Sequence, residues 1–271
     1  MRASQLLFAM IFLYANGWSQ TTFSIRNASN LGKVCSNVFE LREGYLVAGF
    51  TKDTTALYQY NRILIERYSS GGDLLIHKEF GDVNNSWLVY EDSSVQLNDS
   101  TFLLAFNAWP NQIMSCGLVW FDLNCDTLKT KFIPSPNYDV NGDFVNWIAP
   151  RYLAQDNQAN IYLTAGITSL ETENDIGIFK LDVNGNVLWS YQYLKQTEYD
   201  ICFSIIAVDD GVIVMGGSQN FGDTTNYCTE YYFKLSSSGE LMWEYQNRPE
   251  FDASLPQEIL LFQDEYPCMH R

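Results

Sequence analysis

The sequence predicts an all-β chain built from repeated four-stranded units. Three observations predict it: short apolar segments alternate with polar residues, aromatic residues make up 15% of the chain and fall within those segments, and one motif recurs at near-constant spacing along the 271 residues. Alternation is typical of strands, and a fixed period of this length is typical of stacked repeats. No Gly/Ser linker separates two halves, so we expect one architecture.

The recurring motif has four copies. The clearest are Phe179–Trp189 and Phe233–Trp243, with an earlier copy at Glu66–Ile76 and a degenerate copy at Trp120–Leu128. Successive copies lie 53, 60 and 54 residues apart when they are aligned on Leu75, Leu128, Leu188 and Met242. The near-constant interval predicts one structural unit per copy.

Each copy reads as two strands joined by a tight turn. The turns carry Gly71-Gly72 and Asn184-Gly185, residue types that accept the positive φ of a hairpin turn. After the turn, Val187 and Trp189 share one face of the strand and Leu188 lies on the other. Both faces are apolar, so we expect this fourth strand to be covered on two sides.

A second segment supports the same repeat. Ser204–Gly216 matches Ser36–Gly49 of the first copy. The offset between the two segments is 167 residues, which is the sum of the three motif intervals. The same offset relates Cys35 to Cys202, Gly44 to Gly211, and Gly49 to Gly216. Two independent anchors with one offset indicate a genuine duplication.

One unit therefore holds four short strands. In the fourth copy we expect them at Phe203–Val208, Val212–Gly217, Thr229–Leu235 and Glu240–Tyr245. Four strands in about 54 residues is the size of a β-propeller blade, and so small a sheet must stack on neighbours to bury both faces. An open β-solenoid and a sandwich are the alternatives, but a sandwich does not explain the fixed period. The predicted fold is a β-propeller of four-stranded blades.

The predicted blades fill residues 20–271. They cover about 34–82, 88–139, 145–198 and 202–248, followed by a partial blade at 254–271. Leu255–Phe262 would be a first strand without a partner in its own blade, unless Thr21–Arg26 pairs with it. We therefore expect an apparently incomplete propeller that does not close and that resembles a truncated product.

Residues 1–19 have the pattern of a signal peptide. Arg2 precedes the apolar run Leu6–Ala15, and Gly17 and Ser19 place small residues before Gln20. The run is too short to span a bilayer, and no second run follows, so we expect no membrane span. The expected location is outside the cell, secreted or at the cell surface, with the periplasm as an alternative.

The formal net charge of −16 bears on the partners. An acidic surface repels phosphate backbones and anionic lipid, so we expect no nucleic-acid partner. Solubility outside the cell is the simplest interpretation of this charge. Cation binding is the sharper alternative.

Six cysteines leave the redox state open. Export permits disulfides, and six cysteines allow 15 full pairings. Cys116 and Cys125 flank one strand and its turn, so they are candidates to approach each other. Buried free thiols are the other interpretation. No CxxC motif occurs, which excludes the commonest zinc and redox patterns.

The strand, the Lys-Leu-Asp triplet, the Gly-Asn turn and the Val-Leu-Trp ending resemble those of secreted bacterial β-propellers. Phe179–Trp189 and Phe233–Trp243 carry this resemblance, which is to the PQQ-like and Kelch-like repeat groups and to repeats of surface proteins exported through the type IX route. The resemblance implies that Trp189 and Trp243 pack between blades. A quinoprotein dehydrogenase resembles a larger, eight-bladed propeller with a calcium-bound quinone, and this chain is too short and has no adjacent cysteine pair.

No catalytic, cofactor-binding or metal-binding residue emerges from the motifs. The only histidines are His77, in a predicted fourth strand, and His270, near the end. No nucleophile elbow, zinc-protease motif or phosphate loop occurs. Two acidic turns, Asp139–Asp143 and Asp182–Asn186, place oxygen ligands at alternate positions, as calcium prefers. Their glycine stands fourth, where a hairpin turn needs it, so a solvated turn is the simpler interpretation and no cofactor is expected.

The sequence favours a non-enzyme, a binding or scaffold module at the cell exterior, with a protein or a glycan as ligand. Aromatic residues at the predicted loops are the candidate contacts: Tyr58, Tyr60, Trp109, Trp147 and Tyr227. The alternative is a secreted carboxylate-dependent glycan hydrolase or lyase, although no pair of acidic residues stands out.

The signal peptide predicts that the mature chain starts at Gln20. Mass spectrometry of the exported protein should find no peptide from residues 1–19. A retained leader would contradict secretion by this route.

Overall fold

The computed structural model describes the strands and the tight turns. The described residues are 32–52, 61–81, 86–90, 92–108, 115–133, 147–168, 175–193, 199–219, 228–247, 258–261 and 267–270. All of its regular structure is β-strand. In this part of the chain no helix is long and apolar enough to cross a membrane.

Four antiparallel sheets follow one another along the chain, each with its four main strands paired in sequence order. The first holds β1 (Lys33–Leu41), β2 (Gly44–Lys52), β3 (Asn61–Tyr68) and β4 (Leu74–Phe80). The second holds β5 (Trp87–Leu88), β6 (Ser94–Asn98), β7 (Thr101–Ala108), β8 (Ser115–Asp122) and β9 (Thr127–Ile133). The third holds β10 (Trp147–Gln155), β11 (Ile161–Thr168), β12 (Asp175–Leu181) and β13 (Val187–Tyr193). The fourth holds β14 (Tyr199–Val208), β15 (Gly211–Gln219), β16 (Cys228–Ser236) and β17 (Leu241–Asn247).

The second sheet differs from the others in its first strand. That strand is split into β5 and β6, and both halves pair with β7. Between them Asp92 adopts a positive φ of 53°, and its carbonyl accepts a hydrogen bond from the Leu153 N–H of the third sheet. The interruption thus ties two neighbouring sheets together through the backbone.

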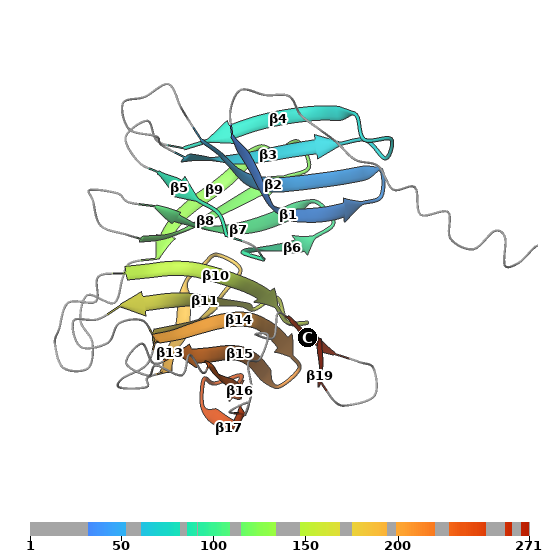
Figure 1. The fold of residues 1–271 in the computed structure, drawn as a ribbon. Helices are drawn as coiled ribbons and strands as arrows, with labels where there is room; N and C mark the ends of the chain where they lie inside the picture. The colour runs from blue at the N-terminus through green and yellow to red at the C-terminus, as the bar shows by residue number, and fades with distance from the viewer. Residues whose placement is uncertain are drawn as a thin grey trace, which may run out of the picture.

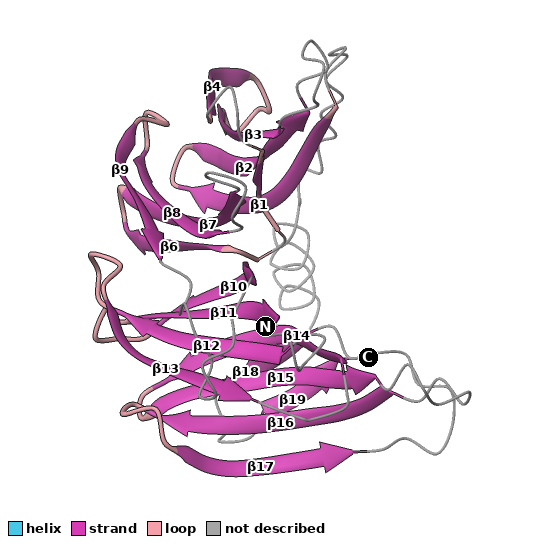
Figure 2. Cartoon of the chain, turned by 90° about the vertical axis from the view of Figure 1, so that its left-hand side faces the viewer, coloured by secondary structure: helices cyan, strands magenta, loops and turns pink. Residues whose placement is uncertain are grey.

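The sheets stack face to face in chain order, as blades of a β-propeller (Figure 1). The first and fourth sheets lie at opposite ends of the stack, and the second and third lie between them, so the blades form an open array (Figure 2). The predicted all-β propeller of four-stranded blades is confirmed. The tight turns of the third and fourth sheets gather on one side of the stack in Figure 2.

The cores lie between consecutive blades and are mostly aliphatic and aromatic. Ile63 and Ile65 of the first blade pack with Phe102 and Phe121 of the second. We call each interface between consecutive blades a seam, and the other two seams are also aliphatic and aromatic. Their central residues are Leu103, Leu118, Leu163 and Phe179 between the second and third blades, and Ile178, Val214, Tyr231 and Phe233 between the third and fourth. Each face buries apolar area that a lone four-stranded sheet would expose.

The offset of 167 residues reproduces local geometry as well as sequence. Gly44 and Gly211 each open a second strand with positive φ, 124° and 154°. A Cβ on either glycine would overlap a backbone carbonyl oxygen of the third strand, so a larger residue does not fit. The first strands β1 and β14 also share a bulge, just after Cys35 and Cys202 respectively.

The four strands predicted for the last full unit all form, with slightly longer bounds. The expectation that fourth strands are covered on two sides is wrong. Val187 and Leu188 are 45% and 53% exposed, because the fourth strand lies at the outer rim of its blade. The third strand takes the covered position, as in β12, where every residue is buried.

The partial fifth unit also differs from the prediction. β18 (Glu258–Leu261) has a partner, since it pairs antiparallel with β19 (Pro267–His270). Thr21–Arg26, the partner considered from the sequence, lies outside the described residues, as do the signal peptide and the first acidic turn at Asp139–Asp143.

Among the cysteines whose side chains the structure describes, Cys35, Cys116, Cys125 and Cys202 are free thiols. The proposed approach of Cys116 and Cys125 does not occur. They lie in different seams, Cys116 between the second and third blades and Cys125 between the first and second.

Gly44→Ala and Gly211→Ala should each lower the free energy of unfolding by at least about 1–2 kcal/mol, since each combines a positive φ with a backbone clash. Gly71→Ala is the matched control, because its Cβ would be 3.6 Å from the nearest atom, Ser69 Oγ. Urea denaturation of the three variants measures the difference. Equal stabilities would show that the two strand-opening glycines are not constrained.

Candidate functional site

Each blade carries the same tight turn between its third and fourth strands. In the third blade the Gly185 N–H donates to the Asp182 carbonyl at 2.8 Å and the Asp182 N–H donates to the Asn186 carbonyl at 3.0 Å. The same two hydrogen bonds close the other three turns. The fourth residue of each turn is left-handed, and these residues are Gly72, Cys125, Gly185 and Gly239, with φ of 88°, 59°, 73° and 89°.

In the first three blades a cross-strand pair faces the turn of the next blade, and the fourth blade has a pair at the same position. One position of the third strand and its partner on the fourth strand carry these residues: Arg67 and Ile76, Trp120 and Lys129, Lys180 and Trp189, and Lys234 and Trp243. Three of the four pairs combine a tryptophan with a lysine. In the second blade the two residue types have exchanged strands, yet they remain directly opposite each other.

The basic side chains donate hydrogen bonds to backbone carbonyls of the following turn. Lys129 Nζ donates to the Asn184 carbonyl at 2.8 Å, and Lys180 Nζ donates to the Ser237 carbonyl at 3.1 Å. In the first blade Arg67 Nη1 donates to the Leu123 carbonyl at 3.3 Å. We call this arrangement, a cross-strand pair on one blade and the turn of the next, the turn clasp.

The tryptophan of the clasp explains the glycine of the turn. A Cβ on Gly185 would lie 2.8 Å from the Trp120 ring, and one on Gly239 would lie 2.9 Å from the Trp189 ring. Trp189 also donates its indole N–H to the Ser237 carbonyl at 3.0 Å. Packing between blades is therefore confirmed for Trp189. Trp243 is 40% exposed, so the same expectation is wrong for it in the described part of the chain.

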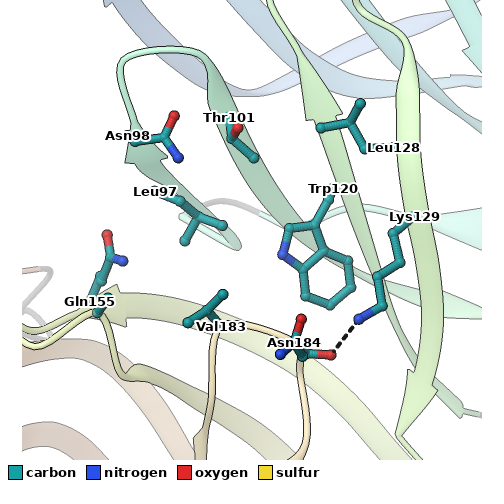
Figure 3. Close-up of a pocket in the computed structure, with 10 residues that line it drawn as sticks. Leu97, Asn98, Thr101, Trp120, Leu128, Lys129, Gln155, Val183 and Asn184 are labelled. Carbon is teal, nitrogen blue, oxygen red and sulfur yellow. Dashed lines mark hydrogen bonds between the residues drawn. The ribbon is translucent and has the colours of Figure 1, made fainter.

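A cleft of about 320 Å³ opens beside the clasp of the second and third blades (Figure 3). It is lined by Leu97, Asn98, Thr101, Trp120, Leu128, Lys129, Gln155, Ala159, Val183 and Asn184. The Lys129 ammonium closes one side, 4.8 Å from the centroid of the Trp120 ring and bonded to the Asn184 carbonyl (Figure 3). Five strands and two turns from two blades contribute to the walls.

The cleft has the chemistry of a binding surface. Its polar lining is three side-chain amides, one hydroxyl and one ammonium, with no carboxylate and no imidazole among its lining residues. Leu128 and Val183 offer apolar surface and are 56% and 52% exposed. Such a lining accepts and donates hydrogen bonds around an apolar centre, as small recognition sites do. A glycosidase would need two carboxyl groups flanking its substrate.

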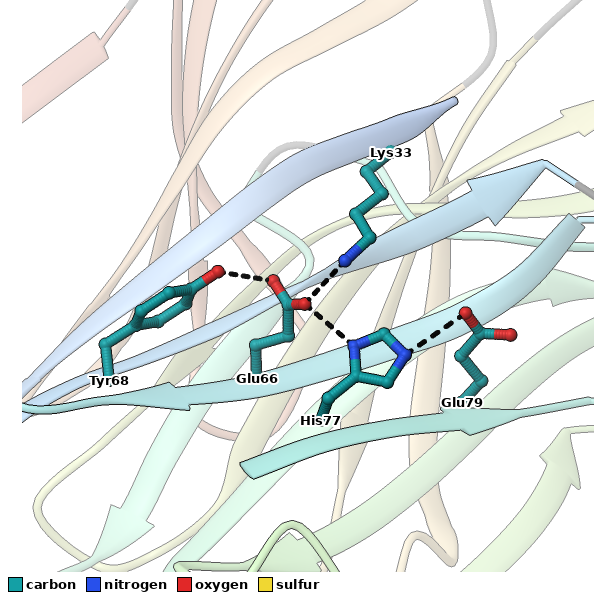
Figure 4. A network of polar contacts seen from close by, with 5 residues as sticks. All are labelled: Lys33, Glu66, Tyr68, His77 and Glu79. Atoms are coloured by element: carbon teal, nitrogen blue, oxygen red, sulfur yellow. Dashed lines mark hydrogen bonds and ion pairs between the residues drawn. The ribbon is translucent and has the colours of Figure 1, made fainter. Parts of the chain in front are cut away.

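A polar network covers the outer face of the first blade (Figure 4). Glu66 is 3% exposed and accepts hydrogen bonds from Lys33 Nζ at 2.8 Å and from the Tyr68 hydroxyl at 2.7 Å. His77 Nδ1 lies 2.8 Å from the same carboxylate, and its Nε2 lies 3.4 Å from Glu79. Burial alone would raise the pKa of Glu66, but the hydrogen bonds from Lys33, Tyr68 and His77 outweigh it and lower that pKa.

The repeat places Glu66 where the other blades have apolar residues. Its equivalents are Val119, Phe179 and Phe233, each buried against the preceding blade. Because side chains alternate along a strand, Glu66 faces away from Ile63 and Ile65, which pack on the second blade. The outer face of the first blade is therefore polar at the position that forms a seam elsewhere.

The acidic turn at Asp182–Asn186 has a structural explanation. Asp182 Oδ1 accepts the Asn184 and Asn186 N–H groups, each at 2.8 Å, and Oδ2 accepts the Asn186 side-chain amide at 2.6 Å. Slight burial opposes ionisation, but these hydrogen bonds lower the pKa of Asp182. Its carboxylate thus stabilises the turn. Among the described residues, no three His, Cys, Asp or Glu side chains gather closely enough to hold a metal ion.

The described thiols are poor nucleophiles. Burial raises the pKa of Cys116, Cys125 and Cys202, to about 11 for Cys125 and about 12 for Cys202. A thiol is reactive only as the thiolate, so these three cysteines are packing residues at neutral pH.

The loop aromatics proposed from the sequence mostly lie outside the described residues. These are Tyr58, Tyr60, Trp109 and Tyr227, whereas Trp147 opens β10. His77 lies in β4, as predicted. Sequence reasoning missed the Trp120 cleft, because the exchange of Trp120 and Lys129 makes that copy look degenerate. The cleft can be recognised by comparing the cross-strand pairs of the blades instead of the linear motif.

Comparison with known proteins gives limited additional information. No protein-family model and no curated protein sequence match the chain. Among solved structures, the chain is similar to the WD40 domain of SCAP from fission yeast, at 8% identity and a TM-score of 0.24, over 92% of this chain and 77% of that one. With so low a score, the fold assignment rests on the sheets themselves.

Trp189→Ala should lower the free energy of unfolding by about 2–4 kcal/mol, because it removes a large side chain and a hydrogen bond from a seam. Trp243→Ala should cost less than about 1 kcal/mol, because that ring is 40% exposed. Thermal and urea unfolding compare the two. Equal losses would contradict the assigned difference in burial.

Glu66→Gln should destabilise the protein at pH 7 by about 1–3 kcal/mol, since it weakens charge-assisted hydrogen bonds to a buried group. The pKa of Glu66 is lowered in the folded state, so its contribution is present above the ordinary glutamate pKa and is lost as the pH falls through the folded value. The difference between parent and variant should therefore shrink below about pH 4. A difference independent of pH would contradict this assignment.

Proposed function

We propose that this chain is a non-catalytic binding module of the cell exterior, and that its ligand site is the cleft between the second and third blades. The observation that carries the proposal is the lining of that cleft, with amide, hydroxyl and apolar groups around the edge of Trp120. Stacked blades hold these groups rigidly, and β-propellers commonly serve as binding scaffolds.

The ligand that fits is a chain rich in hydrogen-bonding groups. Asn98, Gln155 and Asn184 present amides, which pair with the amides of a peptide segment or the hydroxyls of a glycan. The ammonium of Lys129 donates one hydrogen bond to a backbone carbonyl, so two of its three donors remain for acceptor groups of the ligand. The fit supports a protein or a glycan partner.

The exterior location rests on the signal-peptide pattern of residues 1–19, and the net charge of −16 suits a soluble exported protein. The motifs ending at Trp189 and Trp243 also support a resemblance to the secreted PQQ-like and Kelch-like repeat groups. These finer assignments belong to the proposal, and sequencing of the exported form tests the first of them.

Leu128→Asp tests the cleft directly. Leu128 is 56% exposed on the cleft wall, so its replacement should preserve folding and weaken ligand binding at least tenfold. Arrays of peptides and of glycans, read with the full labelled chain, identify the ligand class. Binding should be saturable on one of the two arrays.

Leu75→Asp is the matched control. Leu75 occupies the same repeat position in the first blade, is 54% exposed, and does not line the cleft. It should leave binding unchanged. Equal loss in both variants, or no saturable binding on either array, would overturn the proposed site.

A further inference from the structure

The described contacts leave the cleft beside Trp120 richer in hydrogen-bond donors than in acceptors. Asn98 Oδ1 accepts the N–H and the hydroxyl of Ser100, at 3.0 and 3.1 Å, so this side chain has its NH₂ group left for a ligand. The Asn184 carbonyl accepts from Lys129, which keeps two N–H donors. The other two amides and the hydroxyl of the lining can donate or accept. A ligand that satisfies this lining must therefore supply acceptors.

Lys129 is the one charged side chain among the described residues that line the cleft. Two other lysines lie against carboxylates, with Lys33 at 2.8 Å from Glu66 and Lys234 at 2.6 Å from Asp210. Lys129 instead contacts a carbonyl and an indole ring, and it forms no ion pair with another described residue. Its ammonium can therefore take a carboxylate from a ligand as its first anionic partner.

The apolar part of the cleft suits an aliphatic side chain better than a sugar. Leu128 and Val183 are 56% and 52% exposed, so an apolar group that covers them removes hydrophobic surface from water. Trp120 is only 5% exposed, and the Lys129 ammonium lies over its ring at 4.8 Å from the centroid (Figure 3). The ring thus offers no free face on which a sugar could stack. This lining favours a peptide over a glycan.

The acidity of the whole chain does not oppose an acidic ligand at this point. At physiological salt, charges more than about 8 Å apart are largely screened, so local groups dominate. Lys129 and Lys131 both donate to the turn of the third blade, to Asn184 and Asn186 respectively. The Asp182 carboxylate of that turn accepts the N–H groups of the same two asparagines. Ammonium groups therefore outnumber carboxylates at this turn.

We propose that the cleft binds a peptide segment that carries both a carboxylate side chain and an aliphatic side chain. This inference rests on the proposed function, because it assigns the ligand of the same site. The carboxylate accepts from Lys129, backbone carbonyls of the peptide accept from amides such as Asn98, and the aliphatic side chain covers Leu128 and Val183. Hydrogen bonds to a charged group are roughly twice as strong as neutral ones, so Lys129 determines the preference for an acidic peptide.

An array of acetylated and amidated peptides tests the carboxylate. Each peptide carries one leucine and either one glutamate or one glutamine at varied spacing, and the full labelled chain is bound at physiological salt. The best glutamate peptide should bind saturably and at least about tenfold more tightly than its glutamine counterpart. Lys129→Gln should abolish this preference. Lys129→Arg should retain it, because arginine keeps the charge and the donors.

Lys131→Gln is the matched control. Lys131 lies two residues further along the same strand and donates to the same turn, but it is not among the residues that line the cleft. Its replacement should leave the preference for glutamate unchanged, and urea unfolding shows whether both glutamine variants are folded. Equal loss of the preference in the two variants would assign it to general charge and overturn the role of Lys129.

The other outcomes separate this inference from the proposed function. Peptide binding that Leu128→Asp weakens, but that does not distinguish glutamate from glutamine, would retain the cleft as the site and overturn the carboxylate. Binding of a uronate-bearing glycan without binding of any acidic peptide would overturn the assignment to a peptide. Absence of saturable binding to peptides and to glycans would overturn the proposed function, and this inference with it.

Discussion

The structure depends on the interlock between one blade and the turn of the next. A four-stranded sheet of this size cannot bury both of its faces alone, so each blade is stable only against its neighbours. The seams supply apolar burial, which is non-directional, whereas the clasp fixes how far one blade slides over another. A lysine or arginine bonded to a turn carbonyl, with a tryptophan over a left-handed glycine, has one register in which both contacts form. The cleft beside Trp120 has its shape because this register is held.

Much of the fold follows from the sequence, and the reasons are specific. The glycines at Gly44 and Gly211 keep a spacing of 167 residues because both sit where a Cβ would strike a backbone carbonyl, so the repeat remains visible. The exposure of Val187 and Leu188 could not be predicted from the sequence. Alternation along a strand shows which residues share a face, but not whether the strand lies at the centre or at the rim of the blade. The partner of β18 was missed for a related reason, since a short strand near the end of a period carries little pattern.

The candidate site was harder to predict than the fold. Trp120 and Lys129 face each other across two strands, and their types are exchanged relative to Lys180 and Trp189. An alignment of the repeat copies therefore counts a mismatch at both positions, although a lysine still faces a tryptophan across the two strands. The acidic turn at Asp182 shows the opposite error. Its composition suggests a cation site, but the carboxylate accepts hydrogen bonds from its own turn.

The polar outer face of the first blade gives the stack a direction. Glu66 stands where Val119, Phe179 and Phe233 form seams, and it is already satisfied by Lys33, Tyr68 and His77. Placing another blade on this face would bury the exposed parts of Lys33 and His77 without offering them better partners. The face of the fourth blade, with Trp243 and Tyr245, carries the opposite chemistry. Blades of this design therefore add in one sense only, so the order of units along the chain also dictates which face of each blade receives the next one.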